Sequence, residues 1–306
     1  MAGRAKGNGF LMPFASSGEG MDDPTRGGRP ERRVMEPLIS LNLCSPGGGL
    51  TCFACCPPIR PEGYEHLTYR RSLRRLFSEA RQDFLAGRPA RPMLGFSCPG
   101  LGFLDAAGRQ VGCLYHPSRH GGQDLRLATG YQPKCARESC PQARAFALLD
   151  EPARRRLLGL CADMDAFAFS SDKANPARRL LALGPVVAAA GLSLPLTGLE
   201  ELAGWSWLQE TPPAWGWFLG LWVERQGPEV LRQEGLASVL AIRVERISLA
   251  LGPAPPLADG QPLSRMCDEW EARFWRRASG RRRLRPGTLE RWRQAAGLVL
   301  ESGATV

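Results

Sequence analysis

Cys52-Phe-Ala-Cys55-Cys56 is the most informative stretch of this 306-residue sequence, because it places three thiols within five residues. On a tight loop, a C-x-x-C pair can direct two thiolates at one metal ion, with backbone amides pointing at the sulfurs. The flanking residues are typical of a loop, since Cys44-Ser-Pro-Gly-Gly-Gly precedes the stretch and two prolines follow it. The stretch therefore predicts part of a metal site that needs further ligands from elsewhere.

Those further ligands are concentrated in one window, because eight of the ten cysteines and all three histidines lie between residues 44 and 140. Soft thiolates suit zinc or an iron–sulfur cluster and disfavour magnesium or calcium. The number of thiols suffices for two four-ligand centres, or for one centre with the remaining cysteines structural, and the spacing leaves both the metal and the number of centres open. The candidate metal ligands are Cys52, Cys55, Cys56, Cys98, Cys113, Cys135, Cys140, Cys44 and His116.

The remaining cysteines and histidines are expected to have ordinary structural roles. Cys161 and Cys267 lie on predicted helices, where a lone cysteine usually behaves as a small hydrophobic residue. His66 opens an amphipathic segment, and His120 stands beside two glycines, so both are expected at the surface.

Several familiar cysteine chemistries lack their signatures. The sequence has no C-x-x-C-H for covalent haem, no C-x3-C-x2-C radical-SAM motif and no C-x2-C-x2-C-x3-C-P ferredoxin run. A glycine-rich nucleotide-binding loop after a strand is also missing, which argues against an ordinary methyltransferase that uses S-adenosylmethionine.

Composition divides the chain into two halves, since all eight tryptophans lie at or beyond Trp205, after the cysteine-rich window. We expect an α-rich α+β protein, in which a small irregular cysteine-rich metal-binding domain is followed by a mostly helical domain. The aromatic run from Trp205 to Trp222 is interpreted as core packing of helices rather than as a ligand pocket. The predicted boundaries are a disordered leader over 1–36, the cysteine-rich domain over 37–145 and the helical domain over 146–306.

The hydrophobic periodicity predicts individual elements within this plan. The cysteine-rich half should contain one helix over 65–86 and two short strands, over 103–105 and 111–115, around an Ala-Ala-Gly-Arg turn. Helices in the second half are predicted over 141–160, 177–190, 213–225, 228–249, 263–278 and 288–301.

The charge of +10 permits a nucleic-acid partner, but nearly all the cations are arginines, which also fits a biased codon usage. The chain has no signal-peptide pattern and no uninterrupted apolar run long enough for a membrane span, so a cytoplasmic protein is expected. In a reducing compartment, clustered cysteines more often hold metal than form disulfides. The densest basic patch comprises Arg276, Arg277, Arg281, Arg282, Arg283 and Arg285.

The cysteine pattern resembles that of the YkgJ-like cysteine-cluster proteins, which are described as zinc- or iron-chelating. The resemblance covers about residues 44–140, and Gly48 stands where that family usually has a cysteine, with Cys44 the nearest upstream. It implies a chelating domain, and because some relatives methylate lysines of flagellin, it also admits a protein-modifying enzyme. The matching residues are Cys52, Cys55, Cys56, Ile59, Cys98, Pro99, Leu101, Gly108, Cys113 and Tyr115.

Three functions therefore remain open at this point. The first is a metal-binding protein with a structural or redox centre, whose helical domain contacts a protein partner. The second is a metal-dependent protein-modifying enzyme, similar to a lysine N-methylase, with Asp105, Asp124, Glu138 or His116 as the acid–base group. The third is a zinc-stabilised nucleic-acid-binding module that uses the arginine patch.

Overall fold

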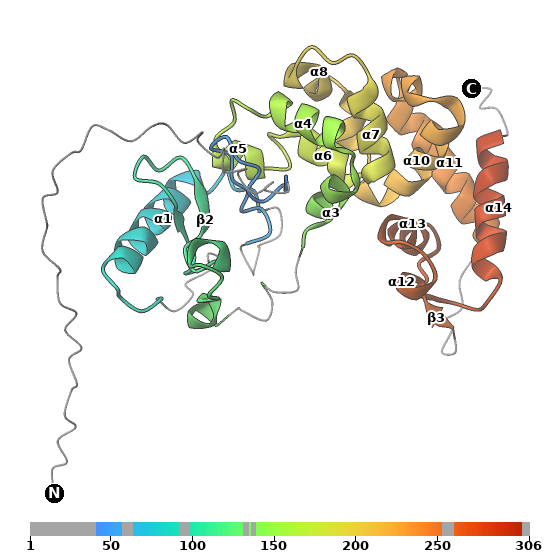
Figure 1. Cartoon of the computed structure of the whole chain (residues 1–306). Helices are drawn as coiled ribbons and strands as arrows, with labels where there is room; N and C mark the ends of the chain where they lie inside the picture. The colour runs from blue at the N-terminus through green and yellow to red at the C-terminus, as the bar shows by residue number, and fades with distance from the viewer. Residues whose placement is uncertain are drawn as a thin grey trace, which may run out of the picture. The chain divides into compact units, whose positions relative to one another are not determined.

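The computed structural model describes residues 41–56, 64–91, 98–130, 135, 139–252 and 260–301 (Figure 1). These residues belong to one compact unit. Helices dominate this part of the chain, and its strands are short, which confirms a helix-rich fold. The predicted leader over 1–36 lies outside the described residues.

The cysteine-rich half is built on one helix and one β-hairpin. Helix α1 packs on β1, and β1 pairs with β2 in antiparallel register, with Leu101 opposite Cys113 and Phe103 opposite Val111. This confirms the predicted hairpin, with its first strand two residues earlier than expected. The elements are α1 (Arg70–Leu85), β1 (Leu101–Phe103), β2 (Val111–Cys113) and the 3-10 helices η1 (Pro117–Arg119) and η2 (Arg126–Thr129).

The second half is a succession of short helices with one small hairpin, β3 with β4. The elements are α3 (Pro141–Leu148), α4 (Glu151–Leu160), α5 (Ala166–Ser170), α6 (Pro176–Ala182), α7 (Pro185–Ser193), α8 (Leu199–Ala203), α9 (Ser206–Glu210), η3 (Pro213–Trp215), α10 (Gly216–Gln226), η4 (Pro228–Arg232), α11 (Leu236–Leu251), β3 (Gln261–Pro262), α12 (Leu263–Met266), α13 (Glu269–Ser279), β4 (Arg283–Leu284) and α14 (Thr288–Glu301).

Several predicted helices are wrong in length, because capping residues interrupt them. The segment 141–160 splits at Asp150, whose carboxylate accepts a hydrogen bond from Ala153 N (2.8 Å) and so starts α4. The segment 263–278 splits likewise at Asp268, whose carboxylate accepts bonds from the amides of Trp270 and Glu271. Gly184 and Pro185 end α6 and start α7, and Gly235 separates η4 from α11.

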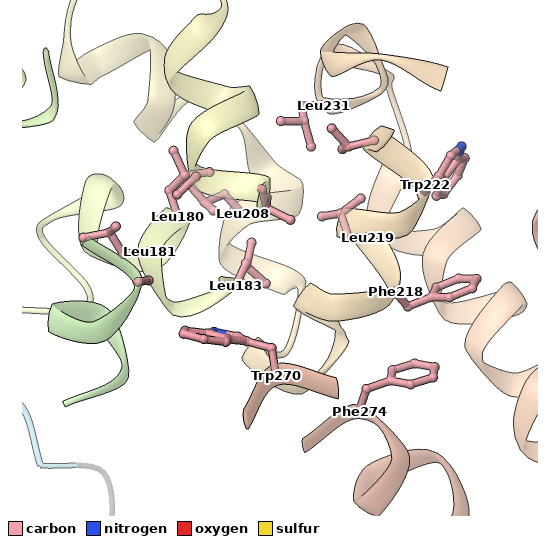
Figure 2. Packing of buried hydrophobic residues seen from close by; sticks show 14 of the residues in the cluster. Leu180, Leu181, Leu183, Leu208, Phe218, Leu219, Trp222, Leu231, Trp270 and Phe274 are labelled. Carbon is pink, nitrogen blue, oxygen red and sulfur yellow. The ribbon is translucent and has the colours of Figure 1, made fainter. Parts of the chain in front are cut away.

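Two hydrophobic clusters hold the described residues together. The larger one fills the helical half, where Leu180, Leu208, Phe218 and Phe274 are among the buried side chains (Figure 2). Trp207 and Trp222 are also buried there, which confirms core packing for these members of the aromatic run. The burial of these large side chains is the main favourable contribution to the stability of the helical half.

The smaller cluster lies in the cysteine-rich half, around the aromatic ring of Phe53. Phe77 and Phe167 each meet that ring edge-on, with centroids 5.4 and 5.2 Å away. Phe167 belongs to α5, and conversely Leu43 and Leu50 pack in the larger cluster. Each cluster therefore takes side chains from both sides of residue 145.

Phe167→Ala should lower the free energy of unfolding by about 3–5 kcal/mol, because it leaves a cavity against two buried phenylalanine rings. Urea denaturation followed by circular dichroism measures the change. Leu127→Ala is the control, since this leucine side chain is 75% exposed and its loss should be nearly neutral. Equal effects of the two substitutions would contradict the assignment of Phe167 to the core.

Candidate metal centre

Three consecutive glycines bring Cys44 back alongside Cys52. Gly47, Gly48 and Gly49 all have positive φ angles (91°, 60° and 85°), which residues with a Cβ rarely adopt. The turn that they form is closed by the Leu50 amide bonded to the Gly47 carbonyl (3.1 Å), and the Cys52 amide donates to the Cys44 carbonyl (3.0 Å). The loop chemistry predicted for this segment thus positions two candidate ligands together.

The C-x-x-C-C stretch is anchored on both sides by buried hydroxyl groups. The Phe53 amide donates to Ser170 Oγ (3.0 Å), and Thr51 Oγ1 accepts from the Val111 amide of β2 (2.9 Å). A turn closed by Cys56 N and the Phe53 carbonyl (3.0 Å) then presents Cys55. Because the Phe53 ring is fully buried, this loop has a fixed base in the core.

Four cysteines from this region influence one another electrostatically and form what we call the first cysteine set: Cys44, Cys52, Cys55 and Cys140. Cys44 is exposed to solvent as a residue. Partial burial of its thiol, together with the other three thiols of the set, nevertheless raises its pKa from 9.0 to about 12. Cys140 begins α3, where its sulfur accepts a hydrogen bond from the Ala143 amide (3.3 Å). Burial also raises the pKa of Cys140, with Cys55 and Cys52 adding to the shift.

Arg178 completes the surroundings of the first set. Its side chain is only 2% exposed, and its Nη1 donates to Cys52 Sγ (3.2 Å) across 126 residues of sequence, while its Nε bonds Asp172 (2.9 Å). Burial opposes the charged form of the guanidinium, but Cys52, Asp172 and Cys140 raise its pKa by more. Arg178 lies in the first turn of α6. Its backbone amide donates a hydrogen bond to the Asn175 side chain (3.3 Å), which caps that helix and fixes the position of the residue.

The second cysteine set lies around the β1–β2 hairpin and consists of Cys98, Cys113, Cys135 and Cys56. Burial, together with the neighbouring Cys98 and Cys135, raises the pKa of Cys113 to about 11. The Tyr115 amide donates to Cys113, which lowers the pKa and partly offsets these effects. Cys56 interacts with Cys113 but also with Cys52 and bonds Cys55, so it lies between the two sets.

The second set has its own arginine and its own close-packed turn. Arg126 forms a two-pronged ion pair with Asp124 (2.8 and 2.7 Å), and Cys135 and Cys113 contribute to raising its pKa, after the Asp124 hydrogen bond. Gly100 follows Cys98-Pro99, and a Cβ there would lie 3.6 Å from Cys113 Sγ and only 2.9 Å from Thr129 Cγ2. Glycine at this position lets the Cys98-Pro99 segment approach the Thr129 side chain at the end of η2.

His116 and two of the acidic candidates make local hydrogen bonds in the structure. His116 is exposed, and its Nδ1 accepts from the Ser118 amide (3.2 Å), so it caps η1. Asp105 accepts from the amides of Arg109 and Gln110 in the hairpin turn, and Asp124 pairs with Arg126. Glu138 lies outside the described residues.

His66 was expected at the surface, and that prediction is wrong. It is 4% exposed, its ring lies 4.6 Å from the Phe53 ring between centroids, and its Nδ1 bonds the Tyr64 hydroxyl (2.9 Å). His120 is half-buried, with Nε2 at 2.8 Å from the Leu114 carbonyl. Cys161 is fully buried, as predicted for a small hydrophobic residue.

Among the described residues, no group of three or more histidine, cysteine, aspartate or glutamate side chains already has the arrangement of a metal-binding site. None of the ten cysteines forms a disulfide. The donors present are nevertheless those that zinc and iron–sulfur clusters take, with amide and guanidinium groups bonded to the sulfurs. By donor chemistry the residues fit such a group.

Sequence reasoning missed the two arginines because nothing local marks them. Arg178 follows an Asn-Pro helix start, which predicts α6, but a single sequence does not connect it with a thiol 126 residues away. The patch between Arg276 and Arg285 lies elsewhere, and three of its members, Arg276, Arg282 and Arg283, line a surface groove of about 730 Å³. None of the described helices has the length and apolar character to cross a membrane.

Comparison with known proteins finds no matching family model, no matching curated protein and no matching solved structure.

Arg178→Met should slow alkylation of Cys44 and Cys140 in protein treated with a metal chelator, because the lost cation had lowered the pKa of both thiols. Arg178→Lys keeps a cation and should have a smaller effect. Iodoacetamide labelling followed by mass spectrometry gives the rate for each cysteine.

Arg126→Met is the matched control for this measurement, since Arg126 lowers the pKa of Cys113 instead. It should slow alkylation of Cys113 and leave Cys44 and Cys140 unchanged. If both arginine variants slowed all three cysteines equally, the division into two sets would be contradicted.

Proposed function

We propose that this chain is a metal-binding protein with two thiolate centres, one in each cysteine set. Four cysteines satisfy the four positions of a structural zinc ion or of an iron–sulfur cluster. The first centre would be held by Cys44, Cys52, Cys55 and Cys140, and the second by Cys56, Cys98, Cys113 and Cys135.

One observation carries the proposal: the electrostatic interactions among the eight thiols favour two groups, with Cys56 interacting with both, and an arginine–aspartate pair lies beside each group. Four thiolates around zinc or an iron–sulfur cluster leave a net negative charge, which a nearby arginine stabilises in a low-dielectric site. A buried guanidinium against a sulfur is difficult to explain if the thiols serve only as hydrophobic packing.

Metal binding would be coupled to local folding, because the ligands come from segments that are far apart in the sequence. The free energy of binding would then stabilise the arrangement of each set. Cys44 and Cys135 are exposed and offer routes by which metal could enter from solvent. The resemblance to the YkgJ-like proteins on Cys52, Cys55, Cys56, Cys98 and Cys113 supports the same function.

Bound metal should amount to about two zinc ions or two clusters per chain in protein purified without oxygen. Elemental analysis and a UV–visible spectrum measure the content and distinguish zinc from iron–sulfur. Cys140→Ser and Cys113→Ser should each remove one centre and leave the other, because they lie in different sets.

Cys161→Ser and Cys267→Ser are the matched controls, since both cysteines lie outside the two sets. They should retain the full metal content. Protein that folds and carries no metal, or that loses all metal from either single ligand variant, would contradict the proposal of two separate centres.

Binding of metal to the chelator-treated protein should release protons, and its affinity should increase as the pH rises. Burial and neighbouring thiols raise the pKa of Cys44 to about 12 and that of Cys113 to about 11, so these ligands are protonated near neutral pH and must lose a proton to bind. Titration with zinc in buffers of different ionisation enthalpy measures the released protons. Uptake that is independent of pH would contradict thiolate ligation.

A further inference from the structure

An open cleft of about 530 Å³ lies directly beside the first cysteine set. Cys140 and Ala54 contribute to its wall, and its size is in the range of pockets that bind small molecules. Leu208, Ala182 and Pro213 supply an apolar part of the lining. The cleft therefore offers room and apolar surface for an organic ligand.

Arginines give this cleft a positive character. Arg178, Arg179 and Arg273 line it, whereas Asp172 is the acidic side chain among the lining residues, and Asp172 is already paired with Arg178. Arg179 is held by main-chain carbonyls, with its Nε bonded to Leu208 O (3.0 Å), and it makes no ion pair within the described part of the chain. Asp172 interacts with the charge of Arg179 without a direct ion pair, so this charge is only partly neutralised.

The charge of Arg273 is only partly neutralised. Its carboxylate partner Glu269 is shared with Arg144, which forms two hydrogen bonds to it at 2.5 and 2.7 Å. One carboxylate thus faces two guanidinium groups. Planar guanidinium groups are well suited to bind carboxylate and phosphate oxygens through paired hydrogen bonds.

A buried hydroxyl without a partner supplies an independent indication of a ligand. Thr211 lines the cleft and is 3% exposed, yet its Oγ1 has no hydrogen-bond partner among the described residues. Leaving a buried hydroxyl unpaired costs free energy, so such groups in native proteins usually have a partner or a role. An anionic oxygen in the cleft would accept a hydrogen bond from this hydroxyl.

We infer that this cleft binds a small organic oxyanion, a carboxylate or a phosphate monoester, through Arg179, Arg273 and the Thr211 hydroxyl. The apolar lining contacts the body of the ligand, and the charged end lies against the arginines. A ligand held there is adjacent to Cys140 of the first set. The inference depends on the cleft alone and does not require that the cysteines hold a metal.

Isothermal titration of the full-length protein with phenyl phosphate and benzoate tests the inference, with phenol and benzamide as uncharged counterparts. At least one anion should bind, and neither neutral compound should bind comparably. Preference for phenyl phosphate identifies a phosphate ligand, and preference for benzoate identifies a carboxylate. Binding of neither anion, or equal binding of the neutral compounds, would overturn the inference.

Variants locate the binding in the cleft. Arg179→Gln and the isosteric Thr211→Val should each weaken anion binding, Arg179→Gln by about tenfold or more, the size expected for loss of a charge-assisted hydrogen bond. Arg277→Gln removes an equal charge from an exposed arginine outside the cleft and should leave binding unchanged. Anion binding that is unaltered in both cleft variants would also overturn the inference.

Metal content is measured on every sample, so that loss of a metal centre is distinguished from loss of the anion site. Circular dichroism checks that each variant is folded, and Arg179→Gln tests the site independently if Thr211→Val is unstable. Anion binding that persists in chelator-treated protein supports the cleft even where the metal centres fail.

Discussion

The buried guanidinium of Arg178 is the constraint on which the rest of the structure depends. A guanidinium group whose side chain is 2% exposed needs hydrogen-bond acceptors close by, and the side chain of its carboxylate partner, Asp172, is 55% exposed. The second partner is Cys52 Sγ at 3.2 Å, which belongs to the loop that begins the cysteine-rich half. The helical half therefore fixes the position of the first cysteine set through one charged side chain.

The same contact is one of several that link the cysteine-rich half to the helical half. Phe53 extends from the cysteine loop to Phe167 and Ser170 on α5, and Arg178 extends from α6 to Cys52. Because α5 and α6 follow each other closely, one short region of the helical half supports both the aromatic base and the charged side of the loop. A change in the loop would be transmitted to these helices through rigid, buried contacts.

The sequence alone predicted the features that depend on local pattern. The alternation around Ala106-Ala107-Gly108 indicated the β1–β2 hairpin, and the helical spacing of Thr288 to Glu301 indicated α14 with the same bounds. The helix breaks at Asp150 and Asp268 were missed because the apolar residues keep their helical spacing on both sides of each aspartate. The spacing does not show that the carboxylate caps a new helix. The burial of His66 was missed because it depends on Phe53, which is distant from it in the sequence, and because His66 lies in the turn before α1.

For the site, the sequence identified the cysteines but not their grouping. Neither the Arg178–Cys52 contact nor the cleft beside Cys140 has a local signal, since each joins segments that are far apart along the chain. The spacing of the cysteines left one centre or two equally open, and the electrostatic interactions among the thiols are what favour two. The atoms that surround a bound metal ion are therefore the decisive property of this site.

X-ray absorption spectroscopy at the edge of the metal that co-purifies with the full-length protein measures those atoms most directly. Two all-cysteine centres predict a first coordination shell of sulfur alone, at about 2.3 Å, without a nitrogen or oxygen contribution. A shell dominated by nitrogen or oxygen ligands would contradict the central claim that the eight cysteines form the metal centres.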